Sequence, residues 1–154
     1  MALKPDRRVV DQDISWFCNQ VAERGGVVSV DTLGSGISMD QAAALVKYSS
    51  SASGARPVGI LTSQVVNLDL TRQHLNQHKE EVQLGSKVTI LTKGEVTTNH
   101  LVSGITVANG DQAYLGVDGR ITNSTSGAAA NPTIGMFTSK KDEDGYAKVS
   151  VNLP

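Results

Sequence analysis

The chain has 154 residues, enough for one domain with its own hydrophobic core, so neither a disulfide nor a structural metal is required for stability. Its 14 basic and 15 acidic residues leave a net charge of −1, which argues against a dedicated nucleic-acid binder and against a polybasic membrane anchor. The single cysteine, Cys18, excludes an intramolecular disulfide and a multi-cysteine zinc site. No apolar run approaches the ~20 residues of a membrane-spanning helix, so we expect a soluble protein made in the cytoplasm.

The composition favours strands. Val, Ile and Thr are abundant, aromatic residues make up only 4% of the chain, and there are 15 glycines. We therefore expect a mainly β protein: a small β-barrel or sandwich domain with an N-terminal arm and one short amphipathic helix. The expected division places the arm and the helix in residues 1–50 and the β-barrel-like domain in residues 51–154.

The N-terminal part is expected to hold the helix. Residues 1–10 show no clear period and are predicted to form an extended arm. In residues 11–24, the apolar side chains of Ile14, Phe17, Cys18 and Val21 recur at helical spacing, and the two glycines that follow are typical of a helix end. A strand is predicted at residues 27–30 and a glycine-rich loop at 31–38. Residues 44–48 fit either a helix or a strand.

The rest of the chain carries strand and turn signals. Asn109-Gly110 and Asp118-Gly119 are turn dipeptides, and Lys93-Gly94 predicts a hairpin turn between two short strands. Strands are predicted at residues 58–61, 65–70, 87–92, 95–98, 101–107, 112–117, 120–123, 134–138 and 147–153.

Two segments of the chain resemble each other. Residues 57–63 (PVGILTS) and 133–139 (TIGMFTS) share an apolar-Gly-apolar-apolar-Thr-Ser pattern with a nearby proline. The similarity is either a coincidence in a sequence rich in Val and Gly or the mark of two equivalent strands. A glycine inside a strand often marks a bulge or a close backbone approach.

Candidate chemical sites are weak throughout. His74 and His78 have metal-binding spacing, but Leu75 replaces the glutamate of the His-Glu-x-x-His motif. Cys18 lies on the predicted apolar stripe without a neighbouring base. Residues 34–36 (GSG) lack the spacing of a phosphate or dinucleotide loop. The sequence therefore predicts no catalytic residue, no metal site and no cofactor, and it favours a protein that acts through surface contacts.

Several stretches after Gly54 carry a resemblance to a known family. They are residues 57–61, 66–71 followed by 74–78, 85–91, 113–121, 134–137 and 144–149. With these motifs, residues 54–154 resemble the head decoration (cement) proteins of tailed bacteriophages. The motifs describe a compact β-fold and no chemistry.

The resemblance implies a non-enzymatic structural protein on the exterior of the virion capsid. Such a protein would bridge neighbouring major capsid proteins as a homotrimer, with no nucleic-acid or membrane partner. It also implies that residues 1–24 reach over a neighbour. The residues expected to make capsid or intersubunit contacts are Pro5, Arg7, Arg8, Val9, Val10, Ile14, Trp16 and Phe17.

Three other functions compete with this one. The first is another virion part of the same β type, such as a head-fibre base or a tail-tube element. The second is a small hydrolase that combines Ser63 or Ser139 with His74, His78 or His100. The third is a barrel that binds single-stranded nucleic acid, which would show salt-dependent affinity.

Overall fold

The computed structural model describes residues 2–31, 44–65, 80–125 and 131–153, with only the backbone of 68–69 and 74–75. This part is built of strands, which confirms the mainly β class. The strands are β1 (Leu3–Cys18), β2 (Ala22–Glu23), β3 (Val27–Val30), β4 (Leu45–Lys47), β5 (Pro57–Gln64), β6 (Leu68–Asp69), β7 (His74–Leu75), β8 (Glu81–Val82), β9 (Lys87–Thr98), β10 (Gln112–Leu115), β11 (Ile121–Thr122), β12 (Thr133–Phe137) and β13 (Ala147–Asn152). A short 3-10 turn, η1 (Val117–Gly119), follows β10, and no helix in the described residues is long and apolar enough to cross a bilayer.

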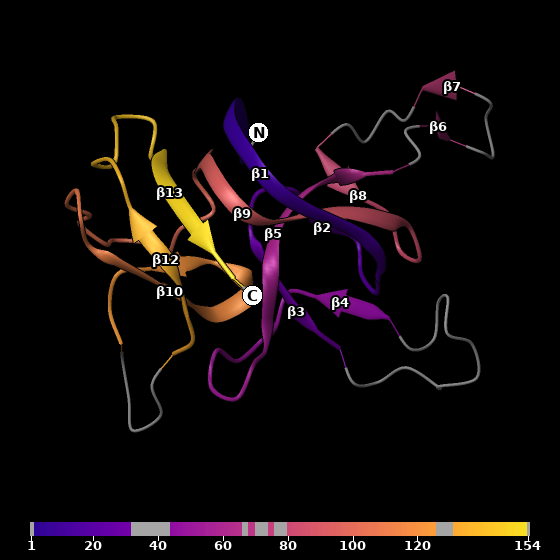
Figure 1. The fold of residues 1–154 in the computed structure, drawn as a ribbon, viewed down its shortest axis with the longest axis horizontal. Helices are drawn as coiled ribbons and strands as arrows, with labels where there is room; N and C mark the ends of the chain where they lie inside the picture. The colour runs from indigo at the N-terminus through magenta and orange to yellow at the C-terminus, as the bar shows by residue number, and fades with distance from the viewer. Residues whose placement is uncertain are drawn as a thin grey trace.

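Nine strands share one sheet, in the order β1-β4-β3-β5-β9-β13-β12-β10-β11. Because β1 also pairs with β9, the first five strands of this order form a ring-like arrangement. Besides β1, β9 pairs with two further strands: its first half pairs with β5 and its second half with β13. In Figure 1, β10, β12 and β13 lie on one side of β5, and β4 lies on the other side.

Two hydrophobic cores lie on opposite faces of the central strands. Neighbouring residues of β3, β5 and β9 alternate between these cores: Val27, Ile60 and Leu91 belong to the first, and Val28, Leu61 and Ile90 belong to the second. The first core continues into β10–β13, and the second fills the ring-like part. The central strands are therefore covered on both faces. For this reason two consecutive residues of one strand, such as Val27 and Val28, can both be apolar and buried.

The helix predicted over residues 11–24 is wrong. Residues 11–18 belong to β1, a strand of 16 residues. The stripe that indicated a helix is divided by the fold, because Cys18 is fully buried whereas Ile14 and Val21 are about half exposed. β1 pairs with β9 over almost its whole length, and this non-local pairing satisfies backbone groups that a helix would have satisfied internally.

The predicted turn at Lys93-Gly94 is also wrong, because β9 runs through it without a break. Gly94 has a φ of +145°, and a Cβ atom there would lie 2.1 Å from the carbonyl oxygen of Arg8. The glycine is therefore needed for the close approach of β1 rather than for a reversal of the chain. The strand predicted at residues 101–107 is likewise absent, and Leu101 forms only an isolated bridge with Ile121.

Several local predictions are confirmed. The strand at residues 27–30 is β3, and the ambiguous segment 44–48 contains β4. β10 and β11 pair as an antiparallel hairpin around Asp118-Gly119, where Asp118 has a φ of +56°. The segments predicted as the last two strands are β12 and β13. Within the strand predicted over residues 65–70, β6 (Leu68–Asp69) is a strand, whereas residues 66–67 and 70 lie outside the described residues.

The division at residue 50 stays a prediction. Strands on both sides of that boundary pair with each other, β1 with β9 and β3 with β5. The residues predicted as a free arm are extended from Leu3 onward, but here they form the first part of β1.

A partly buried polar joint connects the end of β4 to two loops. The Tyr48 hydroxyl donates a hydrogen bond to the carbonyl oxygen of Glu23 and accepts one from the Gly26 N–H at 3.1 Å. The His100 ring packs on Tyr48 with 5.1 Å between centroids, and its Nε2 lies 3.2 Å from the carbonyl oxygen of Asp118. Burial is the main cause that raises the pKa of Tyr48 and lowers the pKa of His100.

This joint predicts a loss of stability in mild acid. Burial lowers the pKa of His100, and the hydrogen bond to the Asp118 carbonyl only partly opposes this shift, so the unfolded chain binds the proton more readily. The free energy of unfolding should therefore fall as the pH drops below about 6.5, the ordinary pKa of histidine. Urea titrations between pH 5 and 8 should show this slope in the natural chain and a flatter one in His100→Gln.

Two controls separate this effect from others. His74 and His78 remain in both proteins, so only the difference between them reports on His100. Asp111 and Asp142 have pKa values lowered mainly by hydrogen bonds from the Ala108 and Tyr146 N–H groups, and their stabilisation is lost only in stronger acid. Equal slopes in the two proteins would contradict the prediction.

Candidate interaction surface on β1

All eight predicted contact residues lie on β1. The first six, Pro5, Arg7, Arg8, Val9, Val10 and Ile14, are exposed, and Trp16 and Phe17 are partly buried. The apolar members are unusually open to solvent: the exposed fraction is 46% for Val9, 62% for Val10 and 50% for Ile14. Large apolar side chains exposed together on a small domain are typical of a contact surface.

The C-terminal end of β1 is fixed to the body of the protein. Trp16 packs against the second core, and its indole N–H donates to the Asp13 carboxylate at 3.0 Å. The Lys87 ammonium lies 5.8 Å from the centroid of the Phe17 ring. These two aromatic residues therefore anchor β1 to the body of the protein.

The N-terminal end of β1 is fixed by charged side chains that reach across β9. Lys4 lies 3.6 Å from the Asp142 carboxylate and over the Tyr146 ring, 4.2 Å from its centroid. Asp6 lies 3.6 Å from the Lys148 ammonium. Such exposed pairs contribute little to stability because solvent screens them, so they orient this end more than they stabilise the fold.

Asp13 remains ionised on the exposed stretch between these ends. Its carboxylate accepts hydrogen bonds from the Ser15 hydroxyl at 2.6 Å and the Ser15 N–H at 2.8 Å, in addition to the one from Trp16. The Ser15 hydroxyl is the largest of the causes that lower the pKa of Asp13. β1 therefore presents an acidic second half after its basic first half.

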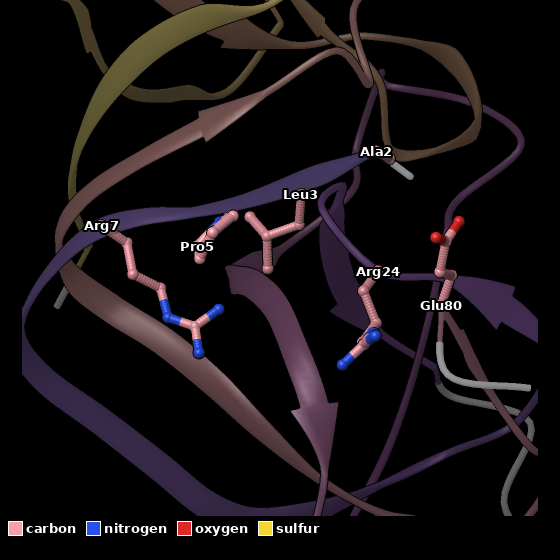
Figure 2. A pocket seen from close by; sticks show the side chains of 6 residues that line it. All are labelled: Ala2, Leu3, Pro5, Arg7, Arg24 and Glu80. Atoms are coloured by element: carbon pink, nitrogen blue, oxygen red, sulfur yellow. The ribbon is translucent and has the colours of Figure 1, made fainter. Parts of the chain in front are cut away.

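A pocket of about 210 Å³ lies beside the start of β1, lined by Ala2, Leu3, Pro5, Arg7, Arg24 and Glu80. Figure 2 shows the guanidinium groups of Arg7 and Arg24 projecting to the same side, whereas the Glu80 carboxylate points away from them. The Nε of Arg24 is buried without a hydrogen-bond partner. An unsatisfied buried donor is costly, so this atom favours an incoming acceptor.

The electrostatics of the pocket also favour an anion. Burial lowers the pKa of Arg24, the nearby charge of Arg7 lowers it further, and Glu80 acts in the opposite direction. Arginine remains protonated at neutral pH in spite of this, so two like charges share the pocket. A carboxylate placed between them would relieve this repulsion and accept a fork of N–H donors.

Sequence reasoning found Arg7 but missed its partners in the pocket. The helix predicted over residues 11–24 would place Arg24 at its end, and Glu80 lies in a polar segment without a periodic pattern. The two come together because the Arg24 N–H donates to the Glu80 carbonyl oxygen at 2.8 Å, beside the β2–β8 pair. No local motif predicts such a long-range contact.

Among the residues that the structure describes, Ser139, His100 and Cys18 are not assembled into a chemical site. The Ser139 hydroxyl donates to the Lys140 carbonyl at 3.1 Å, whereas His100 belongs to the Tyr48 joint. Cys18 is fully buried, and burial raises the pKa of its thiol. Within the described ranges, no three His, Cys, Asp or Glu side chains gather as metal ligands.

The side chains of the histidine pair, His74 and His78, lie outside the part of the chain that the structure describes. His78 is outside the described residues, and only the backbone of His74 is described. Ser63 lies on β5 opposite Thr89 of β9. The pairing of Ser63 or Ser139 with His74 or His78 therefore stays untested.

Comparisons with known proteins place the chain in a family. The family model described as "Structural cement protein (E217 gp24/Pam3 gp6)" matches residues 10–152. No curated protein matches. A chain in the solved structure titled "The capsid of Myoviridae Phage XM1" has a similar fold, with a TM-score of 0.56 and 14% identity over 99% of this chain and 92% of that one.

The two findings carry different weight. At 14% identity the solved structure shows a shared fold alone. The family model covers β2 to β13 and the second half of β1, which together make up most of the described residues. The chain therefore belongs to the family of phage structural cement proteins, and its role is a structural one in the capsid.

Proposed function

We propose that this protein binds the outer surface of a phage capsid and cements neighbouring major capsid proteins, as a homotrimer and without catalytic activity. The observation that carries the proposal is the family match together with the exposed apolar and charged surface of β1. Neither nucleic acid nor a membrane is a partner in this proposal. The protein is made in the host cytoplasm and resides on the virion exterior.

The trimer increases the strength of modest contacts. Each subunit presents one β1, and a trimer that touches several capsid subunits gains from the high effective concentration of its second and third contacts. The three exposed apolar residues of β1 supply area, and its arginines are a residue type enriched at interface hot spots. A weak single contact thus becomes a persistent attachment.

The structure determines how the surface must be tested. Deletion of residues 1–24 would remove β1 and β2, so β9 would lose its pairing with β1 and β8 would lose its pairing with β2. Such a deletion would damage the fold as well as the contact. Point substitutions of exposed residues avoid this difficulty, because they leave the β1–β9 pairing in place.

The test is binding of purified protein to undecorated phage heads. We expect Ile14→Asp to weaken binding at least tenfold, or about 1.4 kcal/mol, because it places a charge in an apolar contact. Val117→Asp is the matched control, since Val117 is 55% exposed and lies off β1 in η1. Equal affinities of the two variants would exclude β1 as the capsid contact.

Copy number and mass test the remainder of the proposal. Light scattering of the free protein should give a mass that is a multiple of three chain masses, and mixing with heads should deplete this species. Hundreds of copies per particle are expected for a cement protein. A few copies per particle would contradict the proposal and indicate a fibre or tail component instead.

A further inference from the structure

β1 has one paired edge and one open edge. Its pairing with β9 extends from Leu3 to Phe17, whereas its pairing with β4 is limited to Phe17 and Cys18. Between Lys4 and Ser15, the second edge therefore meets no strand among the residues that the structure describes. An open edge of this length presents unpaired N–H and C=O groups, which are a template for another strand.

The open edge is also apolar in the middle. Val9 and Val10 are exposed at the centre of the open stretch. Natural edge strands are usually short, charged or covered, and a long edge with exposed valines is the opposite of that pattern. Pro5 lacks an N–H donor, so an added strand would pair from Asp6 onward.

The charges of β1 indicate what the added strand is. The first half carries Lys4, Arg7 and Arg8 against one acid, Asp6, which already contacts Lys148. The second half carries two acids, Asp11 and Asp13, and no base. A second β1 in antiparallel orientation would place each basic half opposite an acidic half, whereas a parallel copy would place like charges together.

We infer that the open edge of β1 pairs with β1 of a second copy of this chain, antiparallel and about a two-fold axis near Val9 and Val10. A two-fold axis between antiparallel strands places one residue opposite its own copy, because the same patch is used by both subunits. With the axis at Val9, Arg7 lies opposite Asp11 of the partner subunit. With the axis at Val10, it lies opposite Asp13 of the partner subunit.

The pocket beside β1 fits this arrangement. Arg7 is both a member of the open edge and a lining residue, next to Arg24 with its buried, unpartnered Nε. A carboxylate from the partner's acidic half would lie between the two guanidinium groups, which project to the same side in Figure 2. The pairing thus supplies the anion that the pocket favours.

The inference goes beyond the proposed capsid binding. A three-fold trimer contains no two-fold axis that relates two of its chains, so this pairing joins chains of different trimers and links cement proteins to one another. It concerns a contact between copies of this chain and is measured without capsids. Failure of capsid binding and failure of strand pairing are therefore seen in separate experiments.

Cysteine crosslinking tests the axis. Directly opposed residues of antiparallel strands have Cα atoms about 4.5–5.5 Å apart, within the range of a disulfide. Under mild oxidation, either Val9→Cys or Val10→Cys should form a covalent dimer in most chains. The natural Cys18 does not interfere, because it is fully buried.

The matched control is Met136→Cys. Met136 is 44% exposed and lies on β12, whose two edges pair with β10 and β13. It should crosslink at least tenfold more slowly than the better β1 variant. Equal crosslinking rates for the β1 variants and the control would overturn the inference.

Charge exchange tests the orientation, in the background of the cysteine variant that crosslinks better. Arg7→Asp/Arg8→Asp makes both halves of β1 acidic, and Asp11→Lys/Asp13→Lys makes both basic. Each variant alone should crosslink at least tenfold more slowly, since its copies repel each other. An equimolar mixture should recover the rate as a mixed dimer, because every acidic half then meets a basic half.

The outcomes are decisive in both directions. Recovery in the mixture supports the pairing and shows that the variants are folded. Unchanged crosslinking of either variant alone, or no recovery in the mixture, overturns it. Arg56→Asp/Lys140→Asp is the control for net charge, since both residues are exposed and lie off β1, and it should crosslink at the unsubstituted rate.

Discussion

Replacement of Phe137 by alanine is expected to lower the free energy of unfolding by about 3–5 kcal/mol. Phe137 is fully buried in the first core and is the largest of its fully buried side chains. Its neighbours there are mainly Val, Ile, Leu and Ala, and the other phenylalanine of the chain, Phe17, is only partly buried on β1. The cavity left by the ring would therefore have no large side chain to fill it.

Urea unfolding followed by circular dichroism measures this effect through the midpoint, at constant dependence on urea. Met136→Ala is the matched control, since Met136 is the preceding residue of β12 and is 44% exposed. It should change the free energy of unfolding by about 0.5 kcal/mol or less. A loss below 2 kcal/mol for Phe137→Ala would mean that the core collapses around the missing ring.

Gly135→Ala is expected to lower the free energy of unfolding by about 3 kcal/mol or more. A Cβ atom at Gly135 would lie 1.8 Å from the carbonyl oxygen of Ser150 and 2.9 Å from its carbonyl carbon. These are backbone atoms of β13, which cannot rotate away as a side chain would. The methyl group would therefore push β12 and β13 apart next to the Gly135–Val151 pair.

Gly145→Ala separates this steric effect from backbone strain. Gly145 has a φ of +86°, but a Cβ atom there would meet nothing within 4 Å. Its replacement should cost about 1 kcal/mol through strain alone. Equal losses in the two variants, read from the same urea titrations, would contradict the assigned role of Gly135.

The same close approach occurs in the other half of the internal similarity. Gly59 of β5 would bring a Cβ atom to 2.3 Å from the carbonyl oxygen of Leu91 on β9. Both similar segments are thus strands, and each has an interior glycine where a neighbouring strand passes close by. The pattern in the sequence had a structural reason, although it did not reveal which strand would be the neighbour.

The family relationship was accessible from the sequence, and the predicted contact residues share one strand. The resemblance rested on motifs after Gly54, and the family match confirms it over residues 10–152. The contact role of Pro5 to Phe17 stays a prediction. The helical spacing of Ile14 and Val21 misled the assignment of this region because β1 is exposed along most of its length and so shows no alternation of apolar and polar residues.

Local signals by themselves determined the mainly β class, the short strands at residues 27–30 and after residue 111, and the hairpin turn at Asp118-Gly119. These features follow from side-chain shape and turn chemistry within a few residues. Only the tertiary structure decided that β1 is a strand, that β9 continues through Gly94, and that Arg7 meets Arg24. Each of these depends on a neighbour distant in the sequence, whose backbone hydrogen bonds or charges outweigh the weak local preference.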